Sequence, residues 1–272
     1  MIIGTREFDT ENHTYIMGIL NVTPDSFSDG GRHNAPDAAL SHAAAMIAEG
    51  ADIIDVGGES TRPGHTQISD EEEISRAVPV IEQLKREFDI PVSIDTYKSA
   101  VAEAALNAGA DLVNDIWGLK YDRRMASVIA ESGAACCLMH NRQQAQYNDF
   151  LADFTKDLEG SVKLAEEAGI PRDKIILDPG VGFGKTYEMN LTVINRLETL
   201  HTLGLPILLG TSRKSVIGLT LDLPADQREE GTLVTTVYAV QKGCAFVRVH
   251  DVAKNLRAIR MTQALMHEHR FL

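Results

Sequence analysis

Short apolar runs recur along the chain, each bounded by polar or turn-forming residues. Eight of them are rich in β-branched and other apolar side chains: YIMGIL (15–20), DIIDVG (52–57), PVSIDT (91–96), DLVNDI (111–116), ACCLMH (135–140), KIILDPG (174–180), PILLGTS (206–212) and AFVRVH (245–250). Short continuous apolar runs of this kind are typical of buried strands in a parallel sheet. The pattern therefore predicts eight strands.

Amphipathic segments lie between most of these runs, and their spacing predicts helices over residues 35–51, 69–88, 99–110, 122–134 and 150–168. Several end in a glycine where a helix terminus favours the left-handed conformation, namely Gly50, Gly109, Gly133 and Gly169. Strands that alternate with helices imply βαβ units and a parallel sheet. Eight such units favour an α/β fold of the (β/α)8 TIM barrel type over an open sheet.

No linker-like or low-complexity tract interrupts the 272 residues, so we expect a single domain over residues 1–272. The first dozen residues precede the first strand, and we expect them to form a small hairpin or a plug at the base of the barrel. Cys136 and Cys137 lie inside an apolar run, which suits buried, reduced thiols better than a disulfide framework.

The charge and the apolar content exclude two classes of partner. The formal net charge is −13 and no basic block is present, which argues against a nucleic-acid partner. No apolar run approaches the roughly 18 residues of a membrane span, and the N-terminal residues lack a signal-peptide pattern. We therefore expect a soluble, cytoplasmic protein that acts on small molecules.

Polar and charged side chains gather at the C-terminal ends of the predicted strands, where the active sites of barrels lie. These positions hold Asn21; Asp55 with the loop Glu59 to Pro63; Asp95; Asn114 and Asp115; Met139 and His140; Asp178; Ser212 to Lys214; and Arg248 with His250. A single Asp or Asn after a strand is most simply a helix cap or turn former, but so many together indicate a site.

Three of these residues have a structural interpretation. We assign Asp55 and Asp115 mainly structural roles, because their neighbours better fit the inward-facing positions. His140 stays open, with a neutral, packed histidine favoured.

Five basic residues fall at these strand ends although the chain as a whole is acidic: Arg62, Lys185, Arg213, Lys214 and Arg248. A local cationic cluster on an acidic protein attracts an anionic substrate. Gly182, Gly184 and Gly210 allow backbone N–H groups to approach a phosphate, although VGFGK lacks the full spacing of the common nucleotide-binding loops.

The same segments resemble the motifs of dihydropteroate synthases, in order and across nearly the whole chain. They are GILNVTPDSFSDGG (18–31), DIIDVGGESTRPG (52–64), SIDT (93–96), VNDI (113–116), LMH (138–140), ILDPGVGFGK (176–185), GTSRKS (210–215) and RVHDV (248–252). The resemblance implies a transferase of folate biosynthesis that condenses p-aminobenzoate with a 7,8-dihydropterin-6-ylmethyl diphosphate and releases diphosphate. It further implies Mg²⁺ as a cofactor, inhibition by sulfonamides, and a homodimer formed through the last helices.

Roles for single residues follow from the resemblance together with the chemistry of the pterin ring. The implied catalytic residues are Asp95, Lys214, Arg248 and His250, and the implied pterin-binding residues are Asp95, Asn114, Met139, Asp178, Phe183, Lys214 and Arg248. A carboxylate at Asp178 suits the paired N3–H and 2-amino donors of a pterin. Asn114 suits the mixed donor and acceptor edge, and Lys214 suits the 4-oxo oxygen.

The second substrate and the leaving group have their own implied contacts. For p-aminobenzoate they are Asp25, Phe27, Thr61, Arg62, Pro63, Ser212 and Arg213; for diphosphate they are Asn21, Thr61, Arg248 and His250. Asn21 is the implied protein ligand of Mg²⁺, an ion that binds largely through substrate phosphates and water. We expect diphosphate to leave before the amine attacks, because Asp95 would favour the pterin cation that forms.

Two other functions fit a pterin-binding barrel. One is a methyltransferase domain that binds a reduced folate, which would have no use for a diphosphate site. The other is a non-catalytic pterin binder, which would be free to lose Asp95, Lys214, Arg248 or His250; all four are present.

Overall fold

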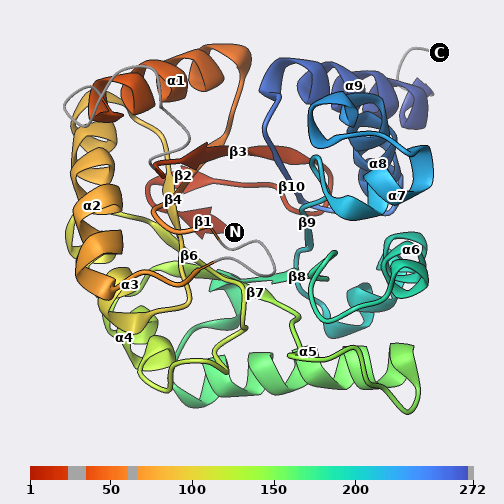
Figure 1. Ribbon diagram of the computed structural model, residues 1–272, viewed down its shortest axis with the longest axis horizontal. Helices are drawn as coiled ribbons and strands as arrows, with labels where there is room; N and C mark the ends of the chain where they lie inside the picture. The colour runs from red at the N-terminus through yellow and green to blue at the C-terminus, as the bar shows by residue number, and fades with distance from the viewer. Residues whose placement is uncertain (24–34, 61–65, 269–272) are drawn as a thin grey trace.

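A computed structural model of the chain describes residues 1–23, 35–60 and 66–268, and it has a parallel barrel surrounded by helices (Figure 1). The barrel strands are β3 (Tyr15–Asn21), β4 (Ile53–Gly57), β5 (Val92–Asp95), β6 (Leu112–Asp115), β7 (Ala135–Met139), β8 (Ile175–Asp178), β9 (Leu208–Leu209) and β10 (Phe246–Val249). Their order is β8-β7-β6-β5-β4-β3-β10-β9, and a parallel bridge between Leu177 and Ile207 joins the two ends. The predicted (β/α)8 fold is confirmed.

The helices lie outside the barrel, and the first five of them follow the five predicted segments. They are α1 (Ala35–Glu49), α2 (Asp70–Glu87), α3 (Ser99–Asn107), α4 (Met125–Ser132), α5 (Phe150–Glu167), α6 (Tyr187–Asn195), α7 (Ser215–Leu221), α8 (Glu229–Gln241) and α9 (Val252–Met266). Gly133 caps α4 with a φ of 70°, as its position predicted. No helix in the described part of the chain is long and apolar enough to cross a membrane.

Alternation along each strand divides the apolar residues between two layers. Ile16, Ile54 and Val113 belong to a large outer cluster that packs the strands against the helices. Met17, Ile53 and Leu112, one position away in each strand, belong to a second cluster inside the barrel. Cys136 lies in the outer cluster and Cys137 in the inner one, and both are free, buried thiols as predicted.

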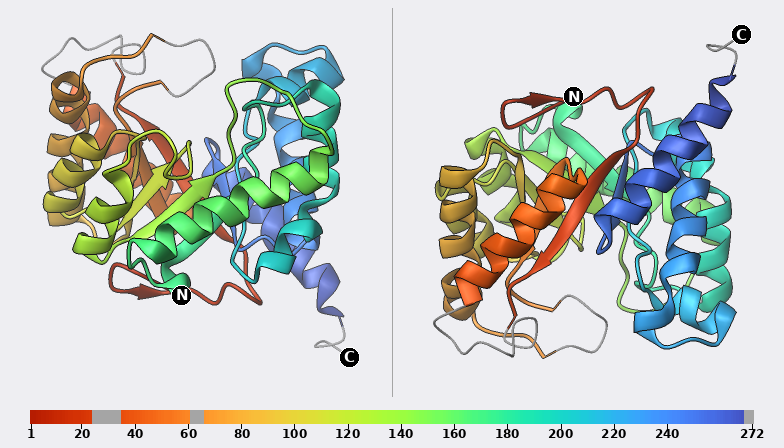
Figure 2. Two further views of the ribbon diagram at one scale, coloured as in Figure 1. Left: turned by 90° about the horizontal axis from the view of Figure 1, so that it is seen from below. Right: turned by 90° about the horizontal axis from the view of Figure 1, so that it is seen from above.

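A hairpin closes the barrel at the end where the strands begin. Strands β1 (Ile2–Ile3) and β2 (Arg6–Glu7) pair antiparallel, and Ile3 and Phe8 pack into the inner cluster. The Phe8 ring lies 4.8 Å from Tyr15 and 5.6 Å from Phe246, measured between centroids. Figure 2 shows the hairpin at the end where β3 begins, so the predicted plug does not cover the carboxyl ends of the strands.

Candidate active site

Arg248 of β10 reaches across the barrel to two carboxylates. Its Nε donates to Asp55 Oδ2 of β4 at 2.6 Å, and its Nη2 donates to Asp95 Oδ2 of β5 at 2.7 Å. The amide nitrogen of Asn114, at the end of β6, lies 3.5 Å from Asp55 Oδ2 and 3.5 Å from Asp95 Oδ1. Residues from four strands therefore meet in one buried polar cluster.

The prediction that the neighbours of Asp55 face inward is wrong, because Ile54 and Val56 belong to the outer cluster. Ile53 belongs to the cluster inside the barrel, and a residue two positions further along a strand points to the same side. The Asp55 side chain accordingly faces the interior, is fully buried, and forms an ion pair with Arg248. The spacing of two residues between the apolar Ile53 and Asp55 was the sequence signal that both side chains point to the same side of the strand.

The Asp55–Arg248–Asp95 cluster holds two carboxylates and one guanidinium, so it carries a net negative formal charge when all are ionised. Burial raises the pKa of Asp95 to about 7; Arg248 opposes this shift, whereas the neighbouring Asp55 carboxylate adds to it. Burial by itself would lower the pKa of Arg248, but its attraction to Asp55 and Asp95 raises that pKa instead. Arg248 therefore stays charged, and Asp95 is poised to change its protonation near neutral pH.

A second pair of opposite charges flanks Gly210. A Cβ atom placed on Gly210 would lie 3.7 Å from Asp178 Oδ2 and 3.8 Å from Lys214 Nζ, so both charged groups lie within contact distance of this glycine. Asp178 Oδ1 accepts the N–H of Gly180 at 2.6 Å, and Lys214 Nζ donates to the carbonyl of Val181 at 2.7 Å. Burial lowers the pKa of Lys214 to about 8 and raises the pKa of Asp178.

Apolar side chains form a wall beside these polar groups. Met139 packs with Tyr97 and Ile116, and Trp117 and Phe183 lie against them. The Lys214 ammonium lies 5.0 Å from the centre of the Phe183 ring, within the range of a cation–π interaction. Met139 and Phe183 were singled out from the sequence, whereas Tyr97, Ile116 and Trp117 were not. Their positions, one or two residues after the ends of β5 and β6, were the available signal.

Asn21 and His250 lie at the mouth of the barrel. A Cβ atom placed on Gly57 would lie 3.3 Å from Asn21 Oδ1 and 3.8 Å from the Cβ of Asp95, which puts Asn21 beside the buried cluster. Ser212 Oγ and His250 Nδ1 are 2.9 Å apart, so these two predicted residues form one hydrogen-bonded pair. Arg213 is exposed, and its backbone is left-handed with a φ of 59°.

Three predicted residues serve the surrounding structure. Asp115 accepts the backbone N–H groups of Trp117 and Leu119 at 2.8 and 2.7 Å, which agrees with its predicted structural role. His140 is buried between Lys185 and Asp157, and burial together with the Lys185 charge lowers its pKa to about 3, so it is neutral as favoured. Lys185, expected to face an anionic substrate, instead donates to backbone carbonyls.

Five predicted site residues, Asp25, Phe27, Thr61, Arg62 and Pro63, lie outside the described residues. Within the described ranges no group of three or more His, Cys, Asp or Glu side chains could hold a metal ion. The Asn21 amide oxygen and an adjoining acidic cluster form a sparse donor set. Such a set fits an ion that keeps most of its bonds to water and substrate phosphates.

Comparison with known proteins identifies the family. Residues 17–250 match the family model for pterin binding enzymes. The chain is 58% identical over 267 residues to the dihydropteroate synthase of Clostridium beijerinckii, which covers 98% of this chain and 99% of that protein. The chain belongs to the pterin-binding enzyme family.

Solved structures of pterin-binding enzymes share this barrel. Dihydropteroate synthase from Clostridium difficile, crystallised in the presence of pteroic acid, is 54% identical and superposes with a TM-score of 0.93, covering 95% of this chain and 99% of that one. The Yersinia pestis dihydropteroate synthase in complex with a sulfonamide drug is 41% identical, with a TM-score of 0.92 and 98% of both chains covered. The resemblance to dihydropteroate synthases that the motifs predicted is confirmed.

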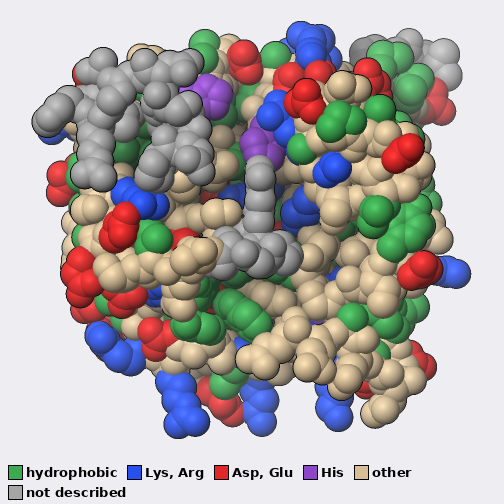
Figure 3. Space-filling model, in the orientation of Figure 1, with side chains coloured by type: hydrophobic (Ala, Val, Ile, Leu, Met, Phe, Trp, Pro, Cys, Tyr) green, Lys and Arg blue, Asp and Glu red, His purple; other side chains and the backbone are tan. Residues whose placement is uncertain are grey.

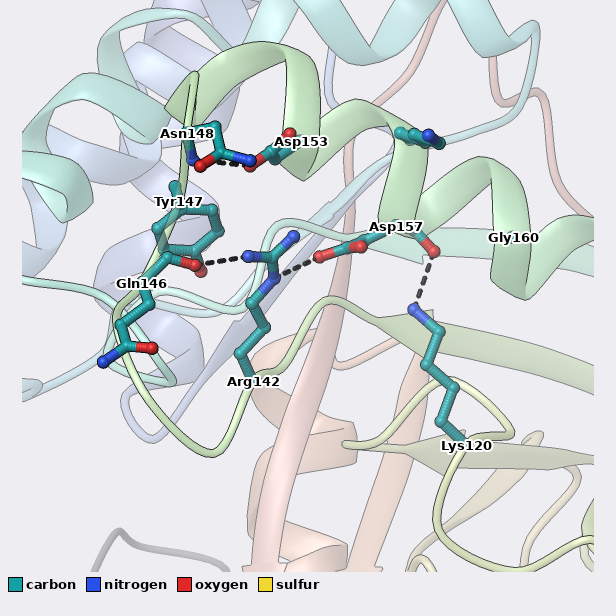
Figure 4. Close-up of a pocket in the computed structure, with 9 residues that line it drawn as sticks. Lys120, Arg142, Gln146, Tyr147, Asn148, Asp153, Asp157 and Gly160 are labelled. Carbon is teal, nitrogen blue, oxygen red and sulfur yellow. Dashed lines mark hydrogen bonds and ion pairs between the residues drawn. The ribbon is translucent and has the colours of Figure 1, made fainter.

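This pterin-binding enzyme also has a polar pocket of about 510 Å³ between the β7–α5 loop and α5. Its lining includes Lys120, Arg142, Tyr147 and Asp157 (Figure 4). Arg142 Nε donates to Asp157 Oδ2 at 2.6 Å, and the same carboxylate oxygen contacts His140 Nε2 at 3.0 Å. His140 thus links the pocket to the loop that carries Phe183.

Proposed function

We propose that the chain is a dihydropteroate synthase. It would condense p-aminobenzoate with a 7,8-dihydropterin-6-ylmethyl diphosphate, forming dihydropteroate and diphosphate. The observation that carries the proposal is the group of buried Asp95, Asn114 and Asp178 beside Lys214 and the Met139 wall, in a chain 58% identical to a dihydropteroate synthase. Figure 3 views the molecule from this end, and Lys, Arg and His side chains (blue and purple) lie near the middle of this face.

The polar groups match the edges of a pterin ring. Asp178 would accept the N3–H and 2-amino donors as a pair, and its burial makes such charge-assisted bonds strong. Asn114 would meet the mixed donor and acceptor edge with its amide. Lys214, already beside Phe183, would donate to the 4-oxo oxygen while Met139 and Phe183 cover the faces of the ring.

The diphosphate end of the substrate requires cations and neutral hydrogen-bond donors. His250, Arg248 and the amide of Asn21 lie at the mouth of the barrel and suit this role. We propose that Asn21 is the protein ligand of Mg²⁺, in keeping with the sparse donor set beside it. A bound Mg²⁺ would offset the negative charge of the diphosphate.

We propose a dissociative reaction. The bond between the methylene carbon and the bridging oxygen breaks first, and diphosphate keeps the electron pair. The pterin methylene becomes cationic, and the net negative Asp55–Arg248–Asp95 cluster favours this charge. The amine of p-aminobenzoate then attacks the carbon and loses a proton.

The contacts to p-aminobenzoate belong to the same proposal. Asp25, Phe27, Thr61, Arg62 and Pro63, with Ser212 and Arg213, are its proposed neighbours. Sulfonamides resemble p-aminobenzoate and would compete there, which agrees with the sulfonamide complex of the Yersinia pestis enzyme. Substituting Phe27 or Pro63 should raise the sulfonamide inhibition constant more than the dissociation constant for the pterin diphosphate, and equal changes in both would contradict the assignment.

We further propose a homodimer formed through the last helices. Large apolar side chains are exposed there: Leu219 of α7, Val234 of α8, and Met261 and Leu265 of α9 are 60–67% exposed. Light scattering should give twice the 29.7 kDa mass of the chain. Val234→Glu should halve that mass, whereas Leu164→Glu on α5 should leave it unchanged; a monomeric wild type contradicts the proposal.

A mixing assay tests the proposed reaction directly. The folded protein is mixed with p-aminobenzoate and the dihydropterin diphosphate, with and without Mg²⁺, and the release of diphosphate is measured. We expect release that depends on Mg²⁺ and yields dihydropteroate; a folded protein that releases nothing would refute the function. The dissociative order is tested with the diphosphate substrate alone, which should yield diphosphate or a trapped pterin adduct without p-aminobenzoate.

A further inference from the structure

The ammonium of Lys185 is enclosed by neutral acceptors. It donates to the carbonyl oxygens of Gly180 at 2.9 Å and Phe183 at 3.0 Å, and it lies 2.8 Å from Nδ1 of His140. No carboxylate of the described residues forms an ion pair with it. An ammonium has three N–H donors, so these three acceptors satisfy all of them.

These contacts determine which nitrogen of His140 carries the proton. Burial lowers the pKa of Lys185 to about 7, so below that pH its side chain is an ammonium that can only donate. A nitrogen that accepts from this ammonium must hold a lone pair, so Nδ1 is unprotonated there. Nε2 then carries the hydrogen and donates to Asp157 Oδ2 at 3.0 Å. Asp157 is held in turn by Arg142 at 2.6 Å (Figure 4), so the tautomer is fixed from outside the pterin-binding site.

The turn around Lys185 depends on close backbone approach. Gly180 and Gly184 both have left-handed backbones, with φ values of 67° and 55°. A Cβ atom on Gly180 would lie 1.9 Å from the carbonyl oxygen of His140, and one on Gly184 would lie 2.4 Å from that of Arg142. The turn therefore lies flat on the segment after β7, and Phe183 projects from it toward Lys214.

Two lysines donate hydrogen bonds to different carbonyl oxygens of this turn. Lys185 donates to those of Gly180 and Phe183, whereas Lys214 donates to that of Val181. Without Lys185 the carbonyls of Gly180 and Phe183 would lose their common donor. The Phe183 N–H would still donate to the Gly180 carbonyl at 3.1 Å, but Phe183 would be held less firmly against the apolar wall that contains Met139.

We propose that Lys185 is a positioning residue whose ammonium fills a cage of carbonyl oxygens and thereby fixes Phe183 for pterin binding, with His140 as the third wall of the cage. The inference rests on the proposed pterin-binding role of Phe183. It assigns Lys185 no contact with substrate, unlike the five-residue cationic cluster expected from the sequence.

Replacement of Lys185 tests the positioning role. Lys185→Met should weaken binding of the dihydropterin diphosphate about tenfold, measured by calorimetry, while kcat at saturation changes less than about threefold. Lys174→Met is the matched control, because Lys174 also donates to a backbone carbonyl, that of Ile2, at the closed end of the barrel. Unchanged affinity in Lys185→Met, or a loss confined to kcat, contradicts the proposal. Wild-type protein that binds no pterin diphosphate would instead refute the proposed function.

A small cation should bind where the ammonium of Lys185 has been removed and restore the contacts of the turn. In Lys185→Ala, ammonium or methylammonium chloride should raise both the melting temperature and the affinity for the pterin diphosphate more than sodium chloride does at equal ionic strength. In wild type and in Lys174→Met the ammonium of Lys185 is present, so the salts should have equal effects on the melting temperature and on the affinity. Equal effects of the salts on Lys185→Ala as well would contradict the proposed cage.

The histidine tautomer provides a test in unmodified protein, independent of how the variants fold and of any substrate. Nitrogen-15 NMR of wild-type protein at pH 6, below the pKa of Lys185 at about 7, should show His140 protonated at Nε2 and unprotonated at Nδ1. A protonated Nδ1 would rule out the arrangement.

Discussion

Arg248 donates from Nε to Oδ2 of Asp55 at 2.6 Å, joining residues that are 193 positions apart in the chain. This pair connects the last barrel strand to the second and places a positive charge against a fully buried carboxylate. The remaining Nη2 donor of Arg248 reaches Asp95, so the Asp55–Arg248 pair controls how strongly Asp95 is stabilised in its charged form.

Asp55→Asn should shift the pH dependence of the reaction. The proposed mechanism needs ionised Asp95, so kcat/KM for the pterin diphosphate should rise with pH through the pKa of Asp95 at about 7. Asp55 raises that pKa, and its removal also leaves Arg248 free to attract Asp95 more strongly. The midpoint of the rise should therefore move to lower pH, as pH–rate profiles of both proteins would show. A midpoint that stays in place, or moves upward, would exclude this coupling.

Asp95→Asn should lower the activity and, as the pH rises from 5 to 8, raise the stability relative to wild type. The folded-state pKa of Asp95 is about 7 and its ordinary value is 3.8, so folded protein binds a proton between these values that unfolded protein has lost. The stability that Asp95 contributes is fully present below pH 3.8 and is lost as pH rises through 7. Relative to wild type, Asp95→Asn should gain roughly 1–3 kcal/mol between pH 5 and pH 8, because it lacks this titration.

Urea denaturation at the two pH values measures this gain, and the mixing assay measures the loss of activity. The exposed Asp173 provides the control, since Asp173→Asn removes a carboxylate without changing the buried cluster. A pH-independent difference between Asp95→Asn and wild type would argue against the raised pKa.

Asp178→Asn should weaken pterin binding without unfolding the barrel. One carboxylate oxygen would become an amide that faces the ring's own donors, so a charge-assisted pair of hydrogen bonds is lost. Such a loss corresponds to a dissociation constant raised about 100-fold. Calorimetry with the dihydropterin diphosphate checks the effect, and the melting temperature of the variant shows whether the barrel stays folded. Retained wild-type affinity for the pterin substrate would remove Asp178 from the site.

Phe8→Ala should destabilise the fold but spare the chemistry. The Phe8 ring is 1% exposed and packs at the closed end of the barrel, so its removal leaves a cavity that costs about 3–5 kcal/mol. Because the site lies at the opposite end, kcat and KM of the remaining folded protein should stay within about twofold of wild type. Ile2→Ala, at a residue 52% exposed, should cost much less in urea denaturation. A large change in KM from Phe8→Ala would show that the two ends are coupled.

The sequence by itself determined the strands, the helices as far as residue 168 and the end of the barrel where the chemistry lies. Apolar runs of strand length and amphipathic segments of helical period are local properties, and the alternation of the two leaves few topologies for a parallel sheet. The motifs at the strand ends then gathered Asn21, Asp95, Asn114, Asp178 and Arg248 before any contact was known.

Only the tertiary structure decided which of these groups meet, because a local sequence pattern does not specify side-chain direction or long-range pairing. Asp55 turned inward since it shares the strand parity of Ile53, and it then met Arg248 across the barrel. Lys185 turned away from the substrate side since left-handed glycines wrapped its own loop around its ammonium. Both outcomes follow from the free energy of burying a charge, which requires a partner that only the closed barrel supplies.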